Sequence, residues 1–194
     1  MIEIGYLIAV ISAIGAIGAA LVTYYLYTIT KRNLVYQVLV KLQMEYRSPE
    51  MLYAISTLWD FYREDCNEDE EKLMEKYGKE YDEEKENLKK VRAVYLEKIE
   101  NCEEYEENPT EFVKTTLHHQ RRLVQMFYEH LAALYANKIL PPNIVFEIWT
   151  EEMLSIIPKI ILPMAKKLAE KTDTKPPDES SKLYQLYIDS KDYV

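Results

Sequence analysis

The residues best suited to chemistry form one short cluster, His118, His119, Arg121 and Arg122. Guanidinium and imidazole groups bind phosphates and carboxylates, so the cluster is a candidate site for an anion or a nucleotide. The two arginines could instead pair with carboxylates and lock a helical bundle. Their candidate partners are the acidic segment 64–107 and Glu147, Glu151 and Glu152. Both interpretations are open from the residues alone.

Neither a metal site nor a catalytic site is expected. His118 and His119 point about 100° apart on a helix, and His130 lies three turns further on, about 16 Å away. No Asp or Glu stands three or four residues from His118 or His119, and Glu-x-x-His pairs, His-Glu-x-x-His and Gly-x-Ser-x-Gly are all absent. The sequence therefore predicts no cofactor, no metal and no catalytic residue. Missing motifs weaken the case for an enzyme without excluding one.

The segment that must position everything else is the uncharged run at residues 4–30. At about 1.5 Å per residue a helix of this length crosses a hydrocarbon core of roughly 30 Å. Nine of the residues from Leu7 to Leu26 are Leu, Ile or Val. The run is about twice as long as the apolar core of a signal peptide and follows a start with no basic residue, so a cleaved signal is disfavoured. We expect a transmembrane helix over residues 1–32.

Charge and aromatic residues give this helix a direction. The first basic residues, Lys31 and Arg32, follow the run, whereas only Glu3 precedes it. The positive-inside rule then places the N-terminus outside and the rest of the chain in the cytoplasm of a single-pass inner-membrane protein. An aromatic belt at the inner interface is expected from Tyr24, Tyr25 and Tyr27.

Small residues recur four apart along the same run, a spacing that lets helix backbones approach closely in lipid. They predict a face for packing on a second copy or on another membrane helix, although Ala and Gly are also simply common in such spans. The face comprises Gly5, Ala9, Ala13, Ser12, Ala16, Ala20, Gly15 and Ala19.

Composition predicts an all-α protein. Only four glycines occur in 194 residues and three of them lie in the apolar run, which leaves Gly78 alone for the remainder. Such a chain lacks the glycines for sheet turns or a phosphate loop. Residues 64–107 hold 18 acidic and 8 basic residues, so this segment carries more than the whole net charge of −9. It should repel nucleic acid and anionic lipid, so no nucleic-acid partner is expected.

Helix signals divide the chain further. A juxtamembrane stalk helix is expected at 33–48, a helical bundle at 49–171 with an acidic helical insert at about 65–107, and a linker with a short docking helix at 172–194. Ser48-Pro49 and Asn108-Pro109 are start signals, and Pro141-Pro142 breaks the chain before Asn143 starts or caps the next helix. These signals predict single helices over 109–137 and from 143 to about 156. The acidic insert is either one long amphipathic helix or two helices broken near 78–85.

Two features of the bundle have alternative interpretations. The apolar run at 153–165 contains Pro158 and Pro163 and is too short to span a bilayer, so it is either a kinked core helix or a segment on the inner leaflet. Cys66 and Cys102 are read as two reduced thiols rather than a disulfide.

The layout resembles an uncharacterised prokaryotic family of single-span, membrane-anchored helical proteins, a domain of unknown function. The resemblance covers roughly residues 5–168 and is carried by YRSPEMLYAISTLWDFYRE and HHQRRLVQMFYEHLAALYANKILPPNIVFEIW, with an acidic insert between them. It implies an anchored helical fold and brings no activity or catalytic residue.

The expected function is that of a membrane-anchored interaction, scaffold or sensor protein that recruits a partner at the inner membrane face. Its expected partners are the lipid bilayer and a protein or a second copy. The alternatives are a small accessory subunit of a larger integral membrane complex, and a ligand-binding or enzymatic bundle that uses the His118–Arg122 cluster.

Overall fold

The computed structural model describes residues 2–100, 109–178 and 180–193, and gives backbone only for residues 2–11, 13, 14, 99 and 100. Within these ranges the chain is helical throughout and contains no strand. The prediction of an all-α helical bundle is confirmed. The chain divides into two units, Met1–Gln43 and Met44–Val194.

The first unit is the greater part of one helix, α1 (Ile2–Tyr46), which is 45 residues long. No proline or other helix-breaking signal occurs before Ser48-Pro49, so the helix continues from the apolar run into the expected stalk without interruption. Its last turn, from Met44 to Tyr46, belongs to the second unit.

No helix among the described residues is both long and apolar enough to cross a membrane. The transmembrane helix expected over residues 1–32 is therefore not supported by the structure. The structure does not describe the side chains of residues 2–11, 13 and 14, which supply much of the apolar run.

The second unit begins at α2 (Pro49–Asp60), where the predicted cap is present. The Ser48 hydroxyl accepts a hydrogen bond from the Met51 backbone N–H, and Pro49 occupies the first turn, where its missing N–H is not needed. This helix buries Met51, Ala54 and Leu58. It continues into the short π-helical segment η1 (Phe61–Asp65).

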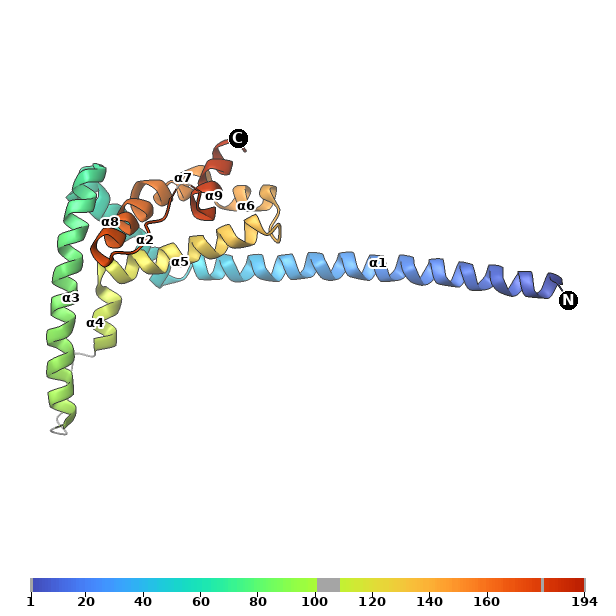
Figure 1. The fold of residues 1–194 in the computed structure, drawn as a ribbon, viewed down its shortest axis with the longest axis horizontal. Coiled ribbons are helices and arrows are strands. Elements are labelled where there is room, and N and C mark those ends of the chain that lie inside the picture. Colours follow the sequence, from blue (N-terminus) through green and yellow to red (C-terminus); the bar gives the residue numbers. More distant parts are fainter. Residues whose placement is uncertain (1, 101–108, 179, 194) are drawn as a thin grey trace. The chain divides into compact units, whose positions relative to one another are not determined.

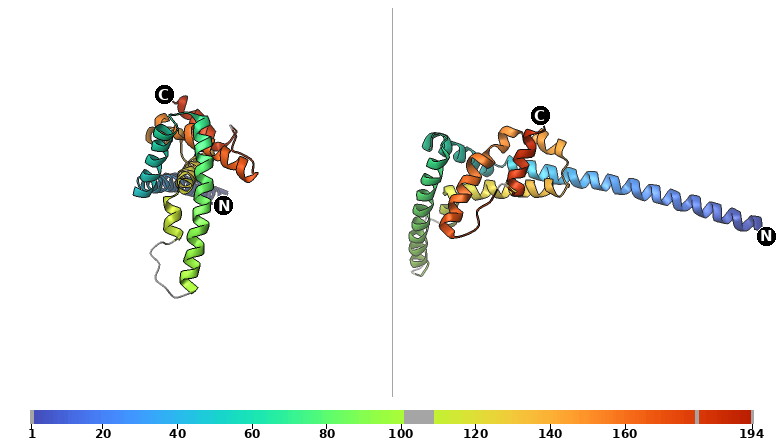
Figure 2. Two further views of the ribbon diagram at one scale, coloured as in Figure 1. Left: turned by 90° about the vertical axis from the view of Figure 1, so that its left-hand side faces the viewer. Right: turned by 45° about the horizontal axis from the view of Figure 1, so that its top comes forward.

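The remaining elements are α3 (Glu70–Glu100), α4 (Pro109–Thr115), α5 (Leu117–Ala136), α6 (Pro142–Ile148), α7 (Glu151–Leu154), η2 (Ile157–Ile161), α8 (Leu162–Thr172) and α9 (Lys182–Lys191). Among them α5 packs on α2, α3, α4, α9 and η2 (Figures 1 and 2). The acidic helix α3 is one helix without a break at residues 78–85.

Two expected helices are each divided. The helix predicted over 109–137 is interrupted at Thr116, whose extended backbone separates α4 from α5. The helix predicted from residue 143 stops at Trp149, which is also extended, before α7 begins. Both predictions of continuity were wrong because a Thr at the N-cap position leaves the apolar spacing on either side unchanged. Thr116 caps α5 through its hydroxyl, whereas Thr150 at the start of α7 makes no side-chain cap hydrogen bond.

An aromatic cluster forms the centre of the second unit. The Tyr46 ring lies 5.3 Å from Phe127, 6.4 Å from Tyr128 and 6.5 Å from Trp149, measured between ring centroids. Phe127, Tyr128 and Trp149 are fully buried. These contacts fix the last turn of α1 to α5 and to the end of α6.

The proline-containing run at 153–165 is part of this core. Pro158 has no N–H to donate, and the helix adopts a π register over η2, with the Leu162 N–H bonded to the Ile157 carbonyl. The run buries Leu154, Ile156, Ile157, Ile160, Ile161, Pro163, Met164 and Ala165. The core-helix interpretation is therefore correct, and the inner-leaflet alternative is wrong for these side chains.

Candidate functional site at the contact between α3 and α5

The predicted cluster lies at the start of α5, where a carboxylate from α3 completes the helix terminus. Thr116 is the N-cap residue, and its hydroxyl accepts a hydrogen bond from the His119 N–H at 3.2 Å. Glu84 of α3 accepts hydrogen bonds from the Leu117 N–H and from the His118 N–H, the latter at 3.2 Å. Together they satisfy three backbone donors that a helix otherwise leaves unpaired.

His118 is held against α3 by two tyrosines. Its Nδ1 lies 3.0 Å from the Tyr77 hydroxyl, and its ring centroid lies 5.0 Å from that of Tyr81. Burial, with Arg121, Arg122 and His119 nearby, lowers the pKa of His118 from 6.5 to about 4. The imidazole is therefore neutral at pH 7, and Nδ1 can accept a hydrogen bond from the Tyr77 hydroxyl.

Arg121 is 5% exposed and reaches a carboxylate only through an amide. Its Nη1 donates a hydrogen bond to Gln125 Oε1, and Gln125 Nε2 donates to Glu129 Oε1 at 2.6 Å. Its Nε has no hydrogen-bond partner, and no direct ion pair to Arg121 occurs among the described residues. Arg121 does not pair with Glu147, Glu151 or Glu152, and no pairing with the acidic segment 64–107 is found for the part of that segment that the structure describes.

The other members of the cluster point elsewhere. His119 approaches α2, with Nε2 3.9 Å from Glu50 Oε1. Arg122 and His130 are exposed. The structure thus brings His118 and Arg121 to the contact with α3 and leaves Arg122 in solvent, because adjacent helical residues point about 100° apart.

The space beside His118 is small. A cavity of about 180 Å³ is lined by Tyr81, Glu84, Lys85, Leu88, Val113, Thr116 and His118. Small-molecule sites commonly measure 300–1,000 Å³. Across the described residues no three His, Cys, Asp or Glu side chains lie close enough to hold a metal ion. The geometry favours a contact that joins α3 to α5 over a site for a nucleotide.

Glu84 was missed as a functional residue in the sequence. It occupies a gap in the apolar stripe of the acidic helix, where a core residue was expected. This missing apolar residue is the signal that could have identified Glu84, because its carboxylate caps α5 where an apolar side chain could not. Burial is the largest effect on Glu84 and raises its pKa, although the two backbone hydrogen bonds act in the opposite direction.

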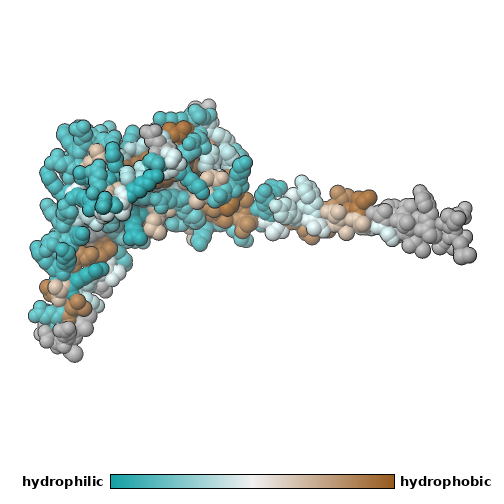
Figure 3. Space-filling model, viewed as in Figure 1, coloured by the Kyte–Doolittle hydropathy of each residue, from teal (hydrophilic) through white to brown (hydrophobic). Residues whose placement is uncertain are grey.

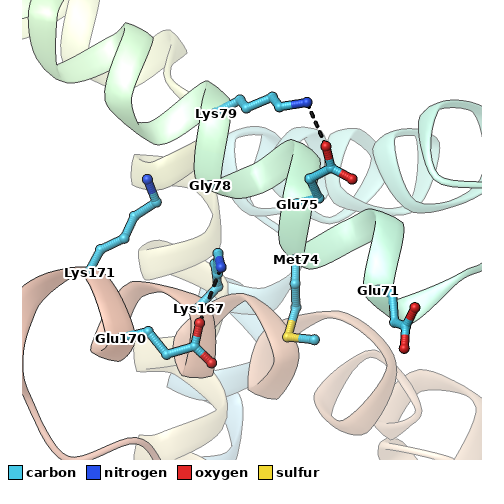
Figure 4. A pocket seen from close by; sticks show the side chains of 8 residues that line it. All are labelled: Glu71, Met74, Glu75, Gly78, Lys79, Lys167, Glu170 and Lys171. Atoms are coloured by element: carbon cyan, nitrogen blue, oxygen red, sulfur yellow. Dashed lines mark hydrogen bonds and ion pairs between the residues drawn. The ribbon is translucent and has the colours of Figure 1, made fainter.

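A second contact joins α3 to α8 around Gly78 (Figure 4). A Cβ atom at Gly78 would lie 3.0 Å from the Lys171 Cε and 3.1 Å from the Lys167 Cε. The aliphatic parts of these two lysine side chains of α8 therefore contact α3 at Gly78. Lys171 pairs with Asp82, and Lys167 pairs with Glu170 at 3.2 Å. The surrounding groove of about 460 Å³ is lined by three carboxylates and three ammonium groups. Lys167 therefore faces the acidic helix, whereas the neighbouring Lys166 of α8 is exposed.

The predicted membrane-facing residues of α1 are described in part. Ser12, Gly15, Ala16, Ala19 and Ala20 are exposed, as are Tyr24, Tyr25, Tyr27, Lys31 and Arg32. The side chains of Ala9 and Ala13, and the surroundings of Gly5, lie outside the described residues.

Cys66 is a buried free thiol, and burial raises its pKa. Cys102 lies outside the described residues.

No family model matches the chain, and no curated protein or solved structure matches it. The resemblance to the family of single-span helical proteins has no support from these comparisons and remains an expectation.

Proposed function

We propose that this chain is a membrane-anchored interaction protein. In this proposal residues 4–30 lie in the bilayer with the N-terminus outside, and the second unit recruits a protein partner at the inner membrane face. The observation that carries the proposal is the exposure of large apolar side chains along α1. Ile17, Leu21 and Val22 are 62%, 65% and 59% exposed.

Apolar side chains in such a continuous series are unfavourable in water. Figure 3 shows the apolar residues of the described part of α1 as an exposed band, whereas the visible surface of the second unit is largely hydrophilic. Burying a Leu, Ile or Val side chain is worth about 1.5–3 kcal/mol, so a lipid core or a protein must cover this helix. The uncharged sequence of residues 4–30 favours lipid, because no charge opposes insertion.

Charge supports the orientation. Lys31 and Arg32 are exposed at the end of the apolar run, where they could meet anionic headgroups of the inner leaflet. Tyr24, Tyr25 and Tyr27 are exposed one to two turns before them, at the depth of an interfacial belt. The second unit would then follow on the same side as Lys31 and Arg32.

The surface proposed for the partner is the C-terminal half of α3. Val94 and Leu96 are 40% and 59% exposed on this half. Figures 1 and 2 show that, among the described helices, α4 alone lies beside this half of α3. The acidic charge of residues 64–107 disfavours nucleic acid and anionic lipid as the occupant, so we assign the surface to a protein.

Crosslinking in native membranes tests the recruitment. We expect the wild-type chain to form a discrete crosslinked product, and Val94→Lys with Leu96→Lys to abolish it without changing the amount of chain in the membrane fraction. Glu80→Gln with Glu83→Gln is the matched control, because it changes the charge by the same two units at exposed positions of the same helix. The same crosslinked product from all three proteins would contradict this part of the proposal.

The exposed small residues of α1 favour a second candidate, an accessory subunit of a larger integral membrane complex. A Cβ atom at Gly15 or Gly18 would meet nothing within 4 Å, so the backbone is accessible to another helix. In this case Gly15→Leu with Ala19→Leu should dissociate the complex on a native gel. Ile17→Leu, a change of shape alone on the same helix, should leave it intact.

A further inference from the structure

A groove of about 590 Å³ lies between the end of α5, the turn into α6 and the last helix, α9. Its apolar lining comes from Tyr135, Ala136, Leu140, Pro141 and Pro142. Its volume falls within the range of small-molecule sites, about 300–1,000 Å³, unlike the cavity beside His118. Nothing proposed above for the chain uses it.

The walls of the groove are fixed before any ligand arrives. The turn after α5 bends through Lys138 in the left-handed region, with φ 57°, and the Ile139 N–H bonds back to the Leu134 carbonyl. Two successive prolines then limit the backbone. On the opposite wall α9 is secured by the buried Leu183 and Leu186.

A hydrogen bond joins the two walls. The Tyr135 hydroxyl donates to Asp189 Oδ2 at 2.8 Å, and Gln185 Nε2 donates to Asp189 Oδ1 at 2.6 Å. Both oxygens of this carboxylate are therefore occupied. Asp189 is the only acidic residue that lines the groove within the described part of the chain.

The positive charges of the groove are not compensated in the same way. Lys138 and Lys182 come from opposite walls, both are exposed, and neither pairs with a carboxylate within 4.0 Å among the described residues. The groove thus combines an apolar body, an occupied carboxylate and two available ammonium groups. This combination is complementary to a molecule with an apolar part and one negative charge.

We propose that this groove binds a small amphipathic carboxylate, with its apolar part against Tyr135, Leu140 and Pro141 and its carboxylate between Lys138 and Lys182. An aliphatic acid derived from lipid and a soluble aromatic acid share this chemistry. The proposal does not depend on membrane anchoring or on a protein partner.

Binding to the full-length chain in detergent micelles tests the proposal, with octanoate and 2-naphthoate as the two acids. Octanol and 2-naphthylmethanol are the uncharged counterparts. We expect at least one acid to bind saturably and about tenfold more tightly than its alcohol, which corresponds to about 1.4 kcal/mol. The tighter acid identifies the aliphatic or the aromatic source.

Substitutions distinguish binding in the groove from partitioning of the acids into the micelle. Lys138→Gln with Lys182→Gln should remove the preference for the acid, whereas Lys90→Gln with Lys166→Gln makes the same charge change at exposed positions elsewhere and should preserve it. Ala136→Trp should abolish binding by filling the groove. If that variant fails to fold, Gln185→Trp obstructs the groove from α9 instead.

The proposal is overturned if neither acid binds saturably, if acids and alcohols bind alike, or if the groove-filling variant binds as well as the wild type. Equal loss of preference in both lysine pairs would also overturn it, since the charge effect would then not belong to the groove.

Discussion

His118 lies half-buried between Tyr77 and Tyr81, and its neutral form is part of the contact between α3 and α5. Protonating this imidazole would place a charge beside Arg121 and remove the acceptor used by the Tyr77 hydroxyl. The contact is thus built for a neutral histidine.

Titration of His118 gives the first prediction. NMR of the histidine ring protons should give a pKa of about 4, well below the usual 6.5, because burial and nearby positive charge oppose protonation. In the Tyr77→Phe variant His118 loses its hydrogen-bond partner, and we expect about 1 kcal/mol less stability. A His118 pKa near 6.5 in the wild type would contradict the described burial.

The same shift predicts how stability depends on pH. The unfolded chain binds a proton at His118 near pH 6.5 and the folded chain only near pH 4, so the unfolded state binds more protons between these values. The stability that this group contributes is present above pH 6.5 and is lost as the pH falls toward 4. The free energy of unfolding, measured with urea, should therefore fall more over this pH range for the wild type than for His118→Gln. Parallel curves for the two proteins would refute the prediction.

At the scale of elements, Glu84 of α3 joins this helix to the start of α5, where Leu117 lies 33 residues further along the chain. Its carboxylate accepts the backbone N–H groups of Leu117 and His118 at the start of α5. Glu84→Ala should lower the free energy of unfolding by about 1–2 kcal/mol, the usual cost of losing a helix cap. Glu83→Ala, an exposed neighbour on the same helix, should change it by less than about 0.5 kcal/mol in the same denaturation experiment. Equal effects would show that Glu84 has no capping role.

Gly78 sets how closely α8 approaches α3. The three atoms nearest to a Cβ at this position belong to the Lys167 and Lys171 side chains, which can shift, so a methyl group can be accommodated and the higher helix propensity of Ala compensates. Gly78→Ala should change the free energy of unfolding by less than about 1 kcal/mol. Gly78→Leu should lower it by about 1–3 kcal/mol, because the larger side chain must push α8 away. Equal stability of the two variants would contradict this packing.

Local signals in the sequence predicted the start of α2 at Ser48-Pro49 and the burial of the proline-containing run. They did not predict the cap at Thr116, which divides α4 from α5. The candidate site was less predictable. The role of Glu84, the amide link from Arg121 to Glu129 and the division of the cluster depend on how α3 crosses α5, which no local spacing specifies.

At the scale of the whole molecule, the proposed anchoring depends on the exposed apolar side chains of α1. Ile17, Leu21 and Val22 are exposed, whereas Trp149, Tyr128 and Phe127 of the second unit are buried. The proposal assigns lipid as the cover of the exposed side chains.

Flotation of the full-length chain after carbonate treatment tests this anchoring most directly. We predict that the wild type floats with lipid, and that Ile17→Arg with Gly18→Arg does not, because each arginine at the centre of the apolar run costs about 2.5–3.5 kcal/mol of insertion free energy. Lys89→Arg with Lys90→Arg, which keeps every charge of α3, should float like the wild type. Recovery of the wild-type chain in the aqueous fraction would contradict the account.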